Sequence, residues 1–142
     1  MALDHGTVRI GVAISDALRI TAGPLTVLEA ATALDDIRAL VDEYQPAVIV
    51  VGLPVTRSGE EGQAAERARA FADRVGELTG VPVELVDERF TTHTAEQALL
   101  EAGVRRRDRR QNVDKVAAAV ILRHYLDRRE NSLDRPGSDP TP

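Results

Sequence analysis

The chain has 142 residues and contains no cysteine, no tryptophan and very few aromatic residues. Without cysteine there can be no disulfide bonds, cysteine-ligated zinc or thiol catalysis, which is typical of proteins from the reducing cytoplasm. Aromatic residues make up 3% of the sequence, so aliphatic side chains must build the core. Few rings also means that few side chains are available to stack on unpaired bases.

Other absences narrow the class of protein further. No apolar run approaches the roughly 18–20 residues of a membrane span, and the N-terminus has no signal segment, so we expect a cytoplasmic protein without membrane contact. The stretch 52–62 lacks the Gly-Lys-Ser/Thr ending of a P-loop, and there is no Gly-x-Ser-x-Gly motif. The sequence therefore favours neither nucleotide hydrolysis of the P-loop type nor the serine chemistry of α/β-hydrolases.

The formal net charge is −5, which argues against nonspecific adhesion to nucleic acid. Positive charge is concentrated in one short segment, which contains Arg105, Arg106, Arg107, Arg109 and Arg110. Because charges are screened over about 8 Å at physiological salt, such a patch can bind phosphate even on an acidic protein. The alternative is a solvated loop.

The hydrophobic pattern predicts one α/β domain. Residues 1–4, 9–15 and 25–28 are predicted to form three antiparallel strands, and strands at 47–51 and 81–87 follow, each after a helix. Helices are predicted at about 34–44, 64–78, 92–103 and 113–126. Thr32 and Asp35 resemble a capping box at the start of the first of these helices. The order is that of a ribonuclease-H-like fold, a mixed five-stranded sheet with helices on its faces. We expect a domain over 1–128 and a disordered tail over 129–142.

Three acidic residues stand where a metal-dependent nuclease would need them. Asp4 ends the first predicted strand, Glu88 ends the last one, and Asp114 opens an alanine-rich helix. Carboxylates at strand ends and a helix start can converge at one edge of a sheet. Mg²⁺ prefers oxygen ligands, and two such ions stabilise the attacking and leaving oxygens in phosphodiester hydrolysis. The three carboxylates are therefore candidate ligands and catalytic residues, with Mg²⁺ or Mn²⁺ in a two-metal site.

Each of these residues also has a purely structural interpretation. Asp4 could be a turn residue, Glu88 part of a surface acidic pair with Asp87, and Asp114 a helix N-terminal residue that gains from the dipole. Side-chain alternation places Glu88 on one face of its strand and Asp87 on the other. We therefore prefer Glu88 as the ligand and interpret Asp87 as a partner for an arginine such as Arg89.

Four ordered motifs resemble those of the YqgF (RuvX) family. They are Leu3-Asp4-His5-Gly6-Thr7 with the strand that follows, Gly52-Leu53-Pro54, Asp87-Glu88-Arg89-Phe90-Thr91-Thr92, and Val113-Asp114-Lys115-Val116-Ala117-Ala118. The resemblance implies a ribonuclease-H-like fold and a cytoplasmic nuclease. It also implies that Asp4, Glu88 and Asp114 are the catalytic residues.

The family is described as pre-16S rRNA nucleases and, earlier, as Holliday junction resolvases. The resemblance thus implies trimming of the 5′ end of the small-subunit rRNA precursor. For the oligomeric state we expect a monomer or a homodimer. Predicted substrate-binding residues are Arg9, Arg89, Thr91, Thr92, Arg105, Arg106, Arg107, Arg109 and Arg110. The family usually has several hydrophobic residues before the first aspartate, whereas three residues precede Asp4 here. This departure indicates either a start codon assigned too late or a weak first strand.

Three other functions remain open at this point. A DNA junction resolvase would need a symmetric dimer to cut two strands. An actin-like phosphotransferase also carries an Asp-x-Gly-Thr hairpin, but it needs a second large domain that 142 residues do not supply. A nonenzymatic RNA-binding or transcription factor could keep the same acidic residues as a vestigial site.

Overall fold

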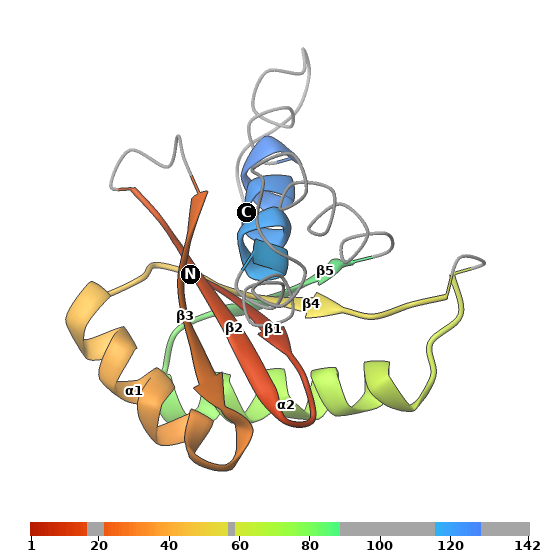
Figure 1. Ribbon diagram of the computed structural model, residues 1–142, viewed down its shortest axis with the longest axis horizontal. Helices are drawn as coiled ribbons and strands as arrows, with labels where there is room; N and C mark the ends of the chain where they lie inside the picture. The colour runs from red at the N-terminus through yellow and green to blue at the C-terminus, as the bar shows by residue number, and fades with distance from the viewer. Residues whose placement is uncertain (17–21, 57–58, 89–115, 129–142) are drawn as a thin grey trace, which may run out of the picture.

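A five-stranded mixed sheet forms the centre of the molecule in the computed structural model, which describes residues 1–16, 22–56, 59–88 and 116–128 (Figure 1). The strands are β1 (Ala2–His5), β2 (Arg9–Ser15), β3 (Ala22–Glu29), β4 (Ile49–Leu53) and β5 (Val83–Asp87). A 3₁₀ turn η1 (Ala30–Thr32) leads into α1 (Ala33–Tyr44), and α2 (Gln63–Thr79) lies between β4 and β5. Residues 116–128 are helical.

The sheet has the predicted mixed topology, with the strand order β3-β2-β1-β4-β5. Strands β1, β2 and β3 pair antiparallel, as their short connections require. Strand β4 pairs parallel to both β1 and β5, because a helix precedes β4 and another separates it from β5. All five residues of β4 are buried, as expected for a central strand covered on both faces.

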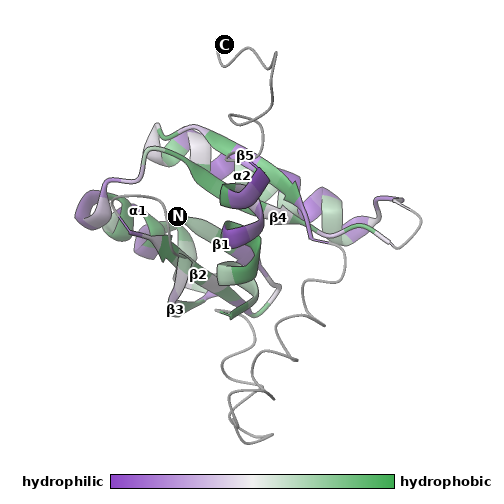
Figure 2. Ribbon diagram, turned by 90° about the horizontal axis from the view of Figure 1, so that it is seen from above, coloured by the Kyte–Doolittle hydropathy of each residue, from purple (hydrophilic) through white to green (hydrophobic). Residues whose placement is uncertain are grey.

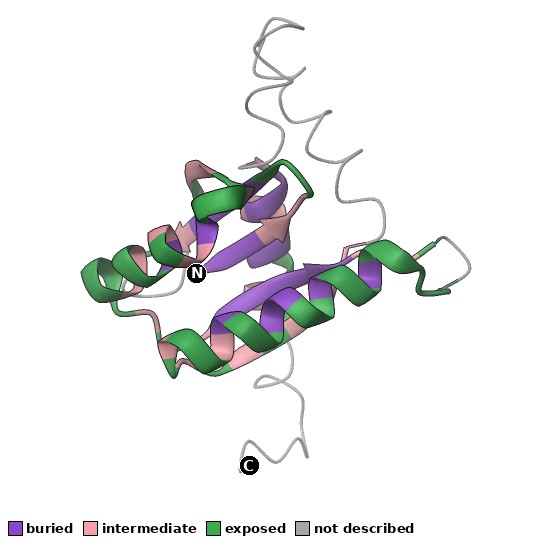
Figure 3. Cartoon of the chain, turned by 90° about the horizontal axis from the view of Figure 1, so that it is seen from below, coloured by how far each residue is buried: buried purple, intermediate pink, exposed green. Residues whose placement is uncertain are grey.

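Two hydrophobic layers enclose the sheet. On one face, α1 and α2 pack on a core that includes Leu3, Val12, Ile37 and Val51. On the other face, helix 116–128 packs through Ala118, Ile121 and Leu122 on Ala2, Ala13, Val50 and Val86. Figure 1 shows α1 and α2 below the sheet and the blue helix above it. Hydrophobic residues run along the strands in Figure 2, and Figure 3 shows α2 exposed on its outer side and buried toward the sheet.

The helix ends agree with the predictions in part. Thr32 is the N-cap residue of α1, but its hydroxyl makes no cap hydrogen bond and instead bonds to Asp36 Oδ2 at 3.0 Å. The predicted capping box with Asp35 is therefore wrong, because the Thr32 hydroxyl bonds to a side chain and not to a backbone N–H of the first turn. Gly80 ends α2 in the left-handed conformation with φ of 72°, as its place after the last apolar residue predicted.

Several predicted features lie outside the described residues. These are the helix at 92–103, the arginine-rich segment, Asp114 and the tail 129–142. The first strand is short, as expected, yet it pairs on both sides with β2 and β4. Among the helices that the structure describes, none combines the length and apolar character that a membrane crossing needs.

Candidate active site

Asp4 lies near the carboxyl end of β1, on the face that helix 116–128 covers. Alternation along the strand fixes this orientation, because Ala2 packs in the core under that helix while Leu3 packs on the opposite face. His5 also points to the opposite face, where its ring lies 4.6 Å from that of Phe71 in α2. Asp4 and His5 therefore point to opposite faces of the sheet, and His5 packs against α2.

Glu88 directly follows β5 and approaches Asp4 from the other side of β4. Its backbone N–H donates to the Leu53 carbonyl at 3.1 Å, which prolongs the β4–β5 pairing by one residue. Val86 packs under helix 116–128, whereas Leu85 packs on the α1–α2 face. The alternation places Glu88 on the face of Asp4 and Asp87 on the other, as the sequence predicted.

Gly52 provides the space in which the two carboxyls meet. It lies on β4, between β1 and β5, and pairs in register with Val86. A Cβ at this position would collide with Glu88 Oε2 and would lie 3.1 Å from Glu88 Cδ. The Glu88 carboxyl therefore lies directly over the backbone of Gly52.

The surroundings of the Glu88 carboxyl favour its neutral form at neutral pH. Burial, the nearby charge of Asp4, a hydrogen bond to Asp4 and the charge of Asp87 together raise the pKa of Glu88 to about 8. Desolvation is the largest of these causes, since a buried carboxylate loses its hydration. The two carboxyls are close enough to share a proton, so they cannot both be ionised at little cost.

Arg9 lies on the same face of the sheet, one diagonal step from Asp4. Asp4 pairs directly with Gly11 of β2, and alternation puts Arg9 on the face of Gly11. Diagonal neighbours in antiparallel strands have Cβ atoms about 7–8 Å apart, within reach of a long side chain. Arg9 is exposed to solvent at the start of β2.

The described residues bring together two of the three predicted carboxylates. Asp114 lies outside them, as do Arg89, Thr91, Thr92, Arg105, Arg106, Arg107, Arg109 and Arg110. Within residues 1–16, 22–56, 59–88 and 116–128, no group of three or more His, Asp or Glu residues could hold a metal ion. The oxygen-only Asp4–Glu88 pair fits a hard divalent cation, which would offset the repulsion between the carboxylates.

Gly52 is the site residue that the sequence did not reveal as functional. Gly52-Leu53-Pro54 resembles a family motif and follows the predicted strand at 47–51, but neither observation assigned a role to Gly52, and β4 in fact continues through Leu53. A glycine within an otherwise apolar strand often marks a place where another group approaches the backbone closely. That signal was present in the sequence, but the group that approaches became clear only in the fold.

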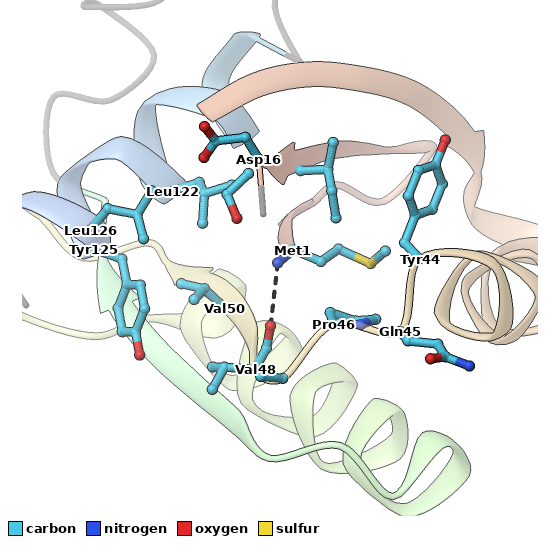
Figure 4. Close-up of a pocket in the computed structure, with 13 residues that line it drawn as sticks. Met1, Asp16, Tyr44, Gln45, Pro46, Val48, Val50, Leu122, Tyr125 and Leu126 are labelled. Carbon is cyan, nitrogen blue, oxygen red and sulfur yellow. Dashed lines mark hydrogen bonds between the residues drawn. The ribbon is translucent and has the colours of Figure 1, made fainter. Parts of the chain in front are cut away.

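A cavity of about 400 Å³ lies elsewhere, at the amino end of β1 (Figure 4). Met1, Ile14, Val48 and Tyr125 are among its lining residues, and the Met1 amino group donates to the Val48 carbonyl at 3.2 Å. Asp4 lies toward the carboxyl end of the same strand. Neither Asp4 nor Glu88 lines this cavity, so it is separate from the acidic site.

The sequence of this chain matches a known protein family. Residues 1–128 match the family described as "RuvX: Holliday junction resolvase". The chain belongs to the RuvX family. This is a family of nucleases, so the protein is a hydrolase that acts on ester bonds of nucleic acid.

Named relatives are similar over almost their whole length. A protein of Roseiflexus sp. (strain RS-1) is 43% identical over 130 residues, covering 89% of this chain and 92% of the relative. A protein of Anaeromyxobacter sp. (strain Fw109-5) is 46% identical over 132 residues, covering 91% and 96% respectively. Both bear the name "Putative pre-16S rRNA nuclease".

Solved structures confirm the ribonuclease-H-like fold. The T. thermophilus RuvC in complex with a Holliday junction substrate matches with a TM-score of 0.55 and 18% identity, covering 91% of this chain and 93% of RuvC. A second Thermus thermophilus RuvC structure matches with a TM-score of 0.51. The RuvX chain thus shares its fold with RuvC at low sequence identity.

Proposed function

We propose that this RuvX protein is a metal-dependent nuclease that trims the 5′ end of the pre-16S rRNA. The observation that carries the proposal is the meeting of Asp4 and Glu88 over Gly52, at the carboxyl ends of β1 and β5. Two carboxyls that burial forces together are costly to ionise, and proteins accept such a cost at functional sites. The names of the relatives support the choice of precursor rRNA as substrate.

Asp4 and Glu88, completed by Asp114, would hold Mg²⁺ or Mn²⁺, with two ions as the expected number. When bound, the ions stabilise the attacking and leaving oxygens of the phosphodiester and neutralise developing charge. Asp114 stands two positions before the first described residue of the helix that packs over Gly52. The sequence of this helix, rich in small residues, favours a close approach to the sheet.

The residues of the chain have distinct tasks in this proposal. Glu88 keeps its proton while the site is empty and releases it when a cation enters, because burial and Asp4 raise its pKa. Arg9, on the solvent-facing side, contacts a phosphate of the substrate backbone. Further phosphate contacts come from Arg89, Thr91 and Thr92 and from the arginines Arg105, Arg106, Arg107, Arg109 and Arg110. The substrate is structured RNA in the cytoplasm.

The test is cleavage of a 5′-extended small-subunit rRNA precursor in Mn²⁺ or Mg²⁺. Wild type is compared with Asp4→Asn, Glu88→Gln and Asp114→Asn, each confirmed as folded by circular dichroism. Loss of metal-dependent cutting in all three variants supports the proposal. Cutting that survives in all three contradicts it, and RNA binding without cutting in wild type indicates a nonenzymatic assembly factor.

A second candidate is a Holliday junction resolvase, favoured by the description of the family and by the RuvC fold. Resolution needs two symmetric cuts, so it requires a homodimer on the junction. Paired incision of a four-way DNA junction, together with a dimer in solution, would favour this candidate. A monomer that cuts only precursor RNA would exclude it.

A further inference from the structure

Gly52 is the point at which three elements approach the same backbone position. On β4, it lies between the strand that carries Asp4 and the strand that Glu88 follows. A Cβ here would collide with Glu88 Oε2 and would lie only 2.6 Å from Ile121 Cδ1 of helix 116–128. Real Cβ atoms essentially never come that close to other atoms, so no side chain fits without displacing both neighbours.

We propose that Gly52 is a positioning residue of the metal site, because its missing side chain lets the Glu88 carboxyl cross β4 to reach Asp4. This inference rests on the proposed function, in which Asp4 and Glu88 hold the metal. A methyl group at position 52 would have to push the Glu88 carboxyl off the strand and away from Asp4. The two oxygen donors would then be separated, while the strand could still form.

The two contacts of position 52 have different consequences. The contact with Ile121 concerns packing, because Ile121 is 1% exposed and belongs to the core under the helix. The contact with Glu88 concerns the metal site. Ile121→Val removes the Cδ1 atom and thereby relieves the packing conflict, but it leaves the conflict with Glu88 in place. This difference separates a structural role of Gly52 from a positioning role.

The experiment measures Mn²⁺ affinity by isothermal titration calorimetry and thermal stability without metal. It uses the full chain as wild type, Gly52→Ala and Gly52→Ala/Ile121→Val. Gly23→Ala is the matched control, since Gly23 also lies in a strand but an added Cβ meets no atom within 4 Å. We expect Gly52→Ala to weaken Mn²⁺ binding by about 10–100-fold, the usual effect of disturbing the support of a metal ligand. Gly23→Ala should bind Mn²⁺ like wild type.

The double variant decides between the two roles. We expect Ile121→Val to recover much of the melting temperature lost in Gly52→Ala and none of the lost Mn²⁺ affinity. Affinity that recovers together with stability would overturn the proposal, as would wild-type affinity in Gly52→Ala. If Gly52→Ala alone does not fold, the Mn²⁺ affinity of the double variant is compared directly with that of wild type, and wild-type affinity in the folded double variant would overturn the proposal.

Two further variants distinguish failure of this inference from failure of the proposed function. Asp4→Asn and Glu88→Gln should each weaken Mn²⁺ binding. If they do and Gly52→Ala does not, only the role of Gly52 is wrong. If neither Asp4→Asn nor Glu88→Gln weakens Mn²⁺ binding, the proposed metal site is wrong, and the inference about Gly52 is wrong as well. In the Glu88→Gln background, Gly52→Ala should cause no further loss of affinity, and an additive loss would contradict action through Glu88.

Discussion

The Glu88 carboxyl donates a hydrogen bond to Asp4 across an intervening strand, directly over the backbone of Gly52. The contact joins residues 84 positions apart in a 142-residue chain, and it brings together two groups that repel each other when ionised. Burial, together with the contact with Asp4 and the charge of Asp87, raises the pKa of Glu88 to about 8, so the fold favours one proton on the pair near neutral pH. The properties of this pair lead to measurable consequences.

Glu88→Gln should stabilise the metal-free protein at alkaline pH. The pKa of Glu88 rises from an ordinary value of 4.5 to about 8 on folding, so between these pH values the unfolded chain loses a proton that the native state retains. The free energy of unfolding of wild type therefore falls with pH, by at most about 1.4 kcal/mol per pH unit and a few kcal/mol in all. Glutamine resembles the protonated carboxyl and does not titrate, so the Glu88→Gln variant avoids this loss of stability.

Urea denaturation in EDTA from pH 4 to 9 measures this effect. The stability difference between Glu88→Gln and wild type should grow above pH 4.5 and level off above pH 8. The comparison is needed because burial lowers the pKa of the Met1 amino group from 8.0 to about 6, which makes stability rise between these values in both proteins. A difference that stays constant with pH would contradict the raised pKa.

Metal binding at pH 7 should release about one proton per protein, because the cation displaces the proton that Asp4 and Glu88 share. Calorimetric titration of Mn²⁺ in two buffers with different ionisation enthalpies measures this number directly. The apparent affinity should increase with pH up to about 8, where Glu88 is ionised without metal. Glu88→Gln is the control, and a proton release that persists in this variant would assign the proton to another group.

Arg9→Ala should weaken binding of precursor RNA without changing Mn²⁺ affinity. Arg9 shares a face with Asp4, and a phosphate contact contributes mainly to salt-dependent affinity. The slope of log affinity against log salt should fall in magnitude by about one. Arg38→Ala is the matched control, since Arg38 is an exposed arginine on α1, which covers the other face of the sheet. Equal losses in the two variants would argue against a specific contact.

His5→Phe should leave cleavage unchanged although His5 is next to Asp4 in sequence. Its side chain packs on Phe71 at a ring distance of 4.6 Å, and burial followed by the charge of Arg67 lowers its pKa, so it is neutral at pH 7. Loss of cleavage in folded His5→Phe would show that His5 takes part in the chemistry.

Phe71→Ala should lower the free energy of unfolding by about 3–5 kcal/mol, since Phe71 is 8% exposed in the core.

Periodicity along the chain was sufficient to predict the layers of the fold. The alternation of Arg9–Ser15 predicted β2 with the bounds observed, and the run at 47–51 predicted a strand buried on both faces. The helical spacing from Leu34 to Tyr44 predicted α1. Such patterns are local, because the side-chain period of a strand or helix follows from its backbone geometry alone. Alternation was also sufficient to place Glu88 and Asp87 on opposite faces of the sheet.

The sequence by itself therefore determined the order of the elements, the faces of the sheet and the candidate acidic residues. Only the tertiary structure decided that Asp4 and Glu88 meet, that His5 belongs to the opposite layer and that Gly52 forms the space between the two carboxyls. The proximity of β1, β4 and β5 depends on parallel pairing between distant segments. Pairing of this kind is settled by the packing of whole helices on the sheet, and no short stretch of sequence encodes it.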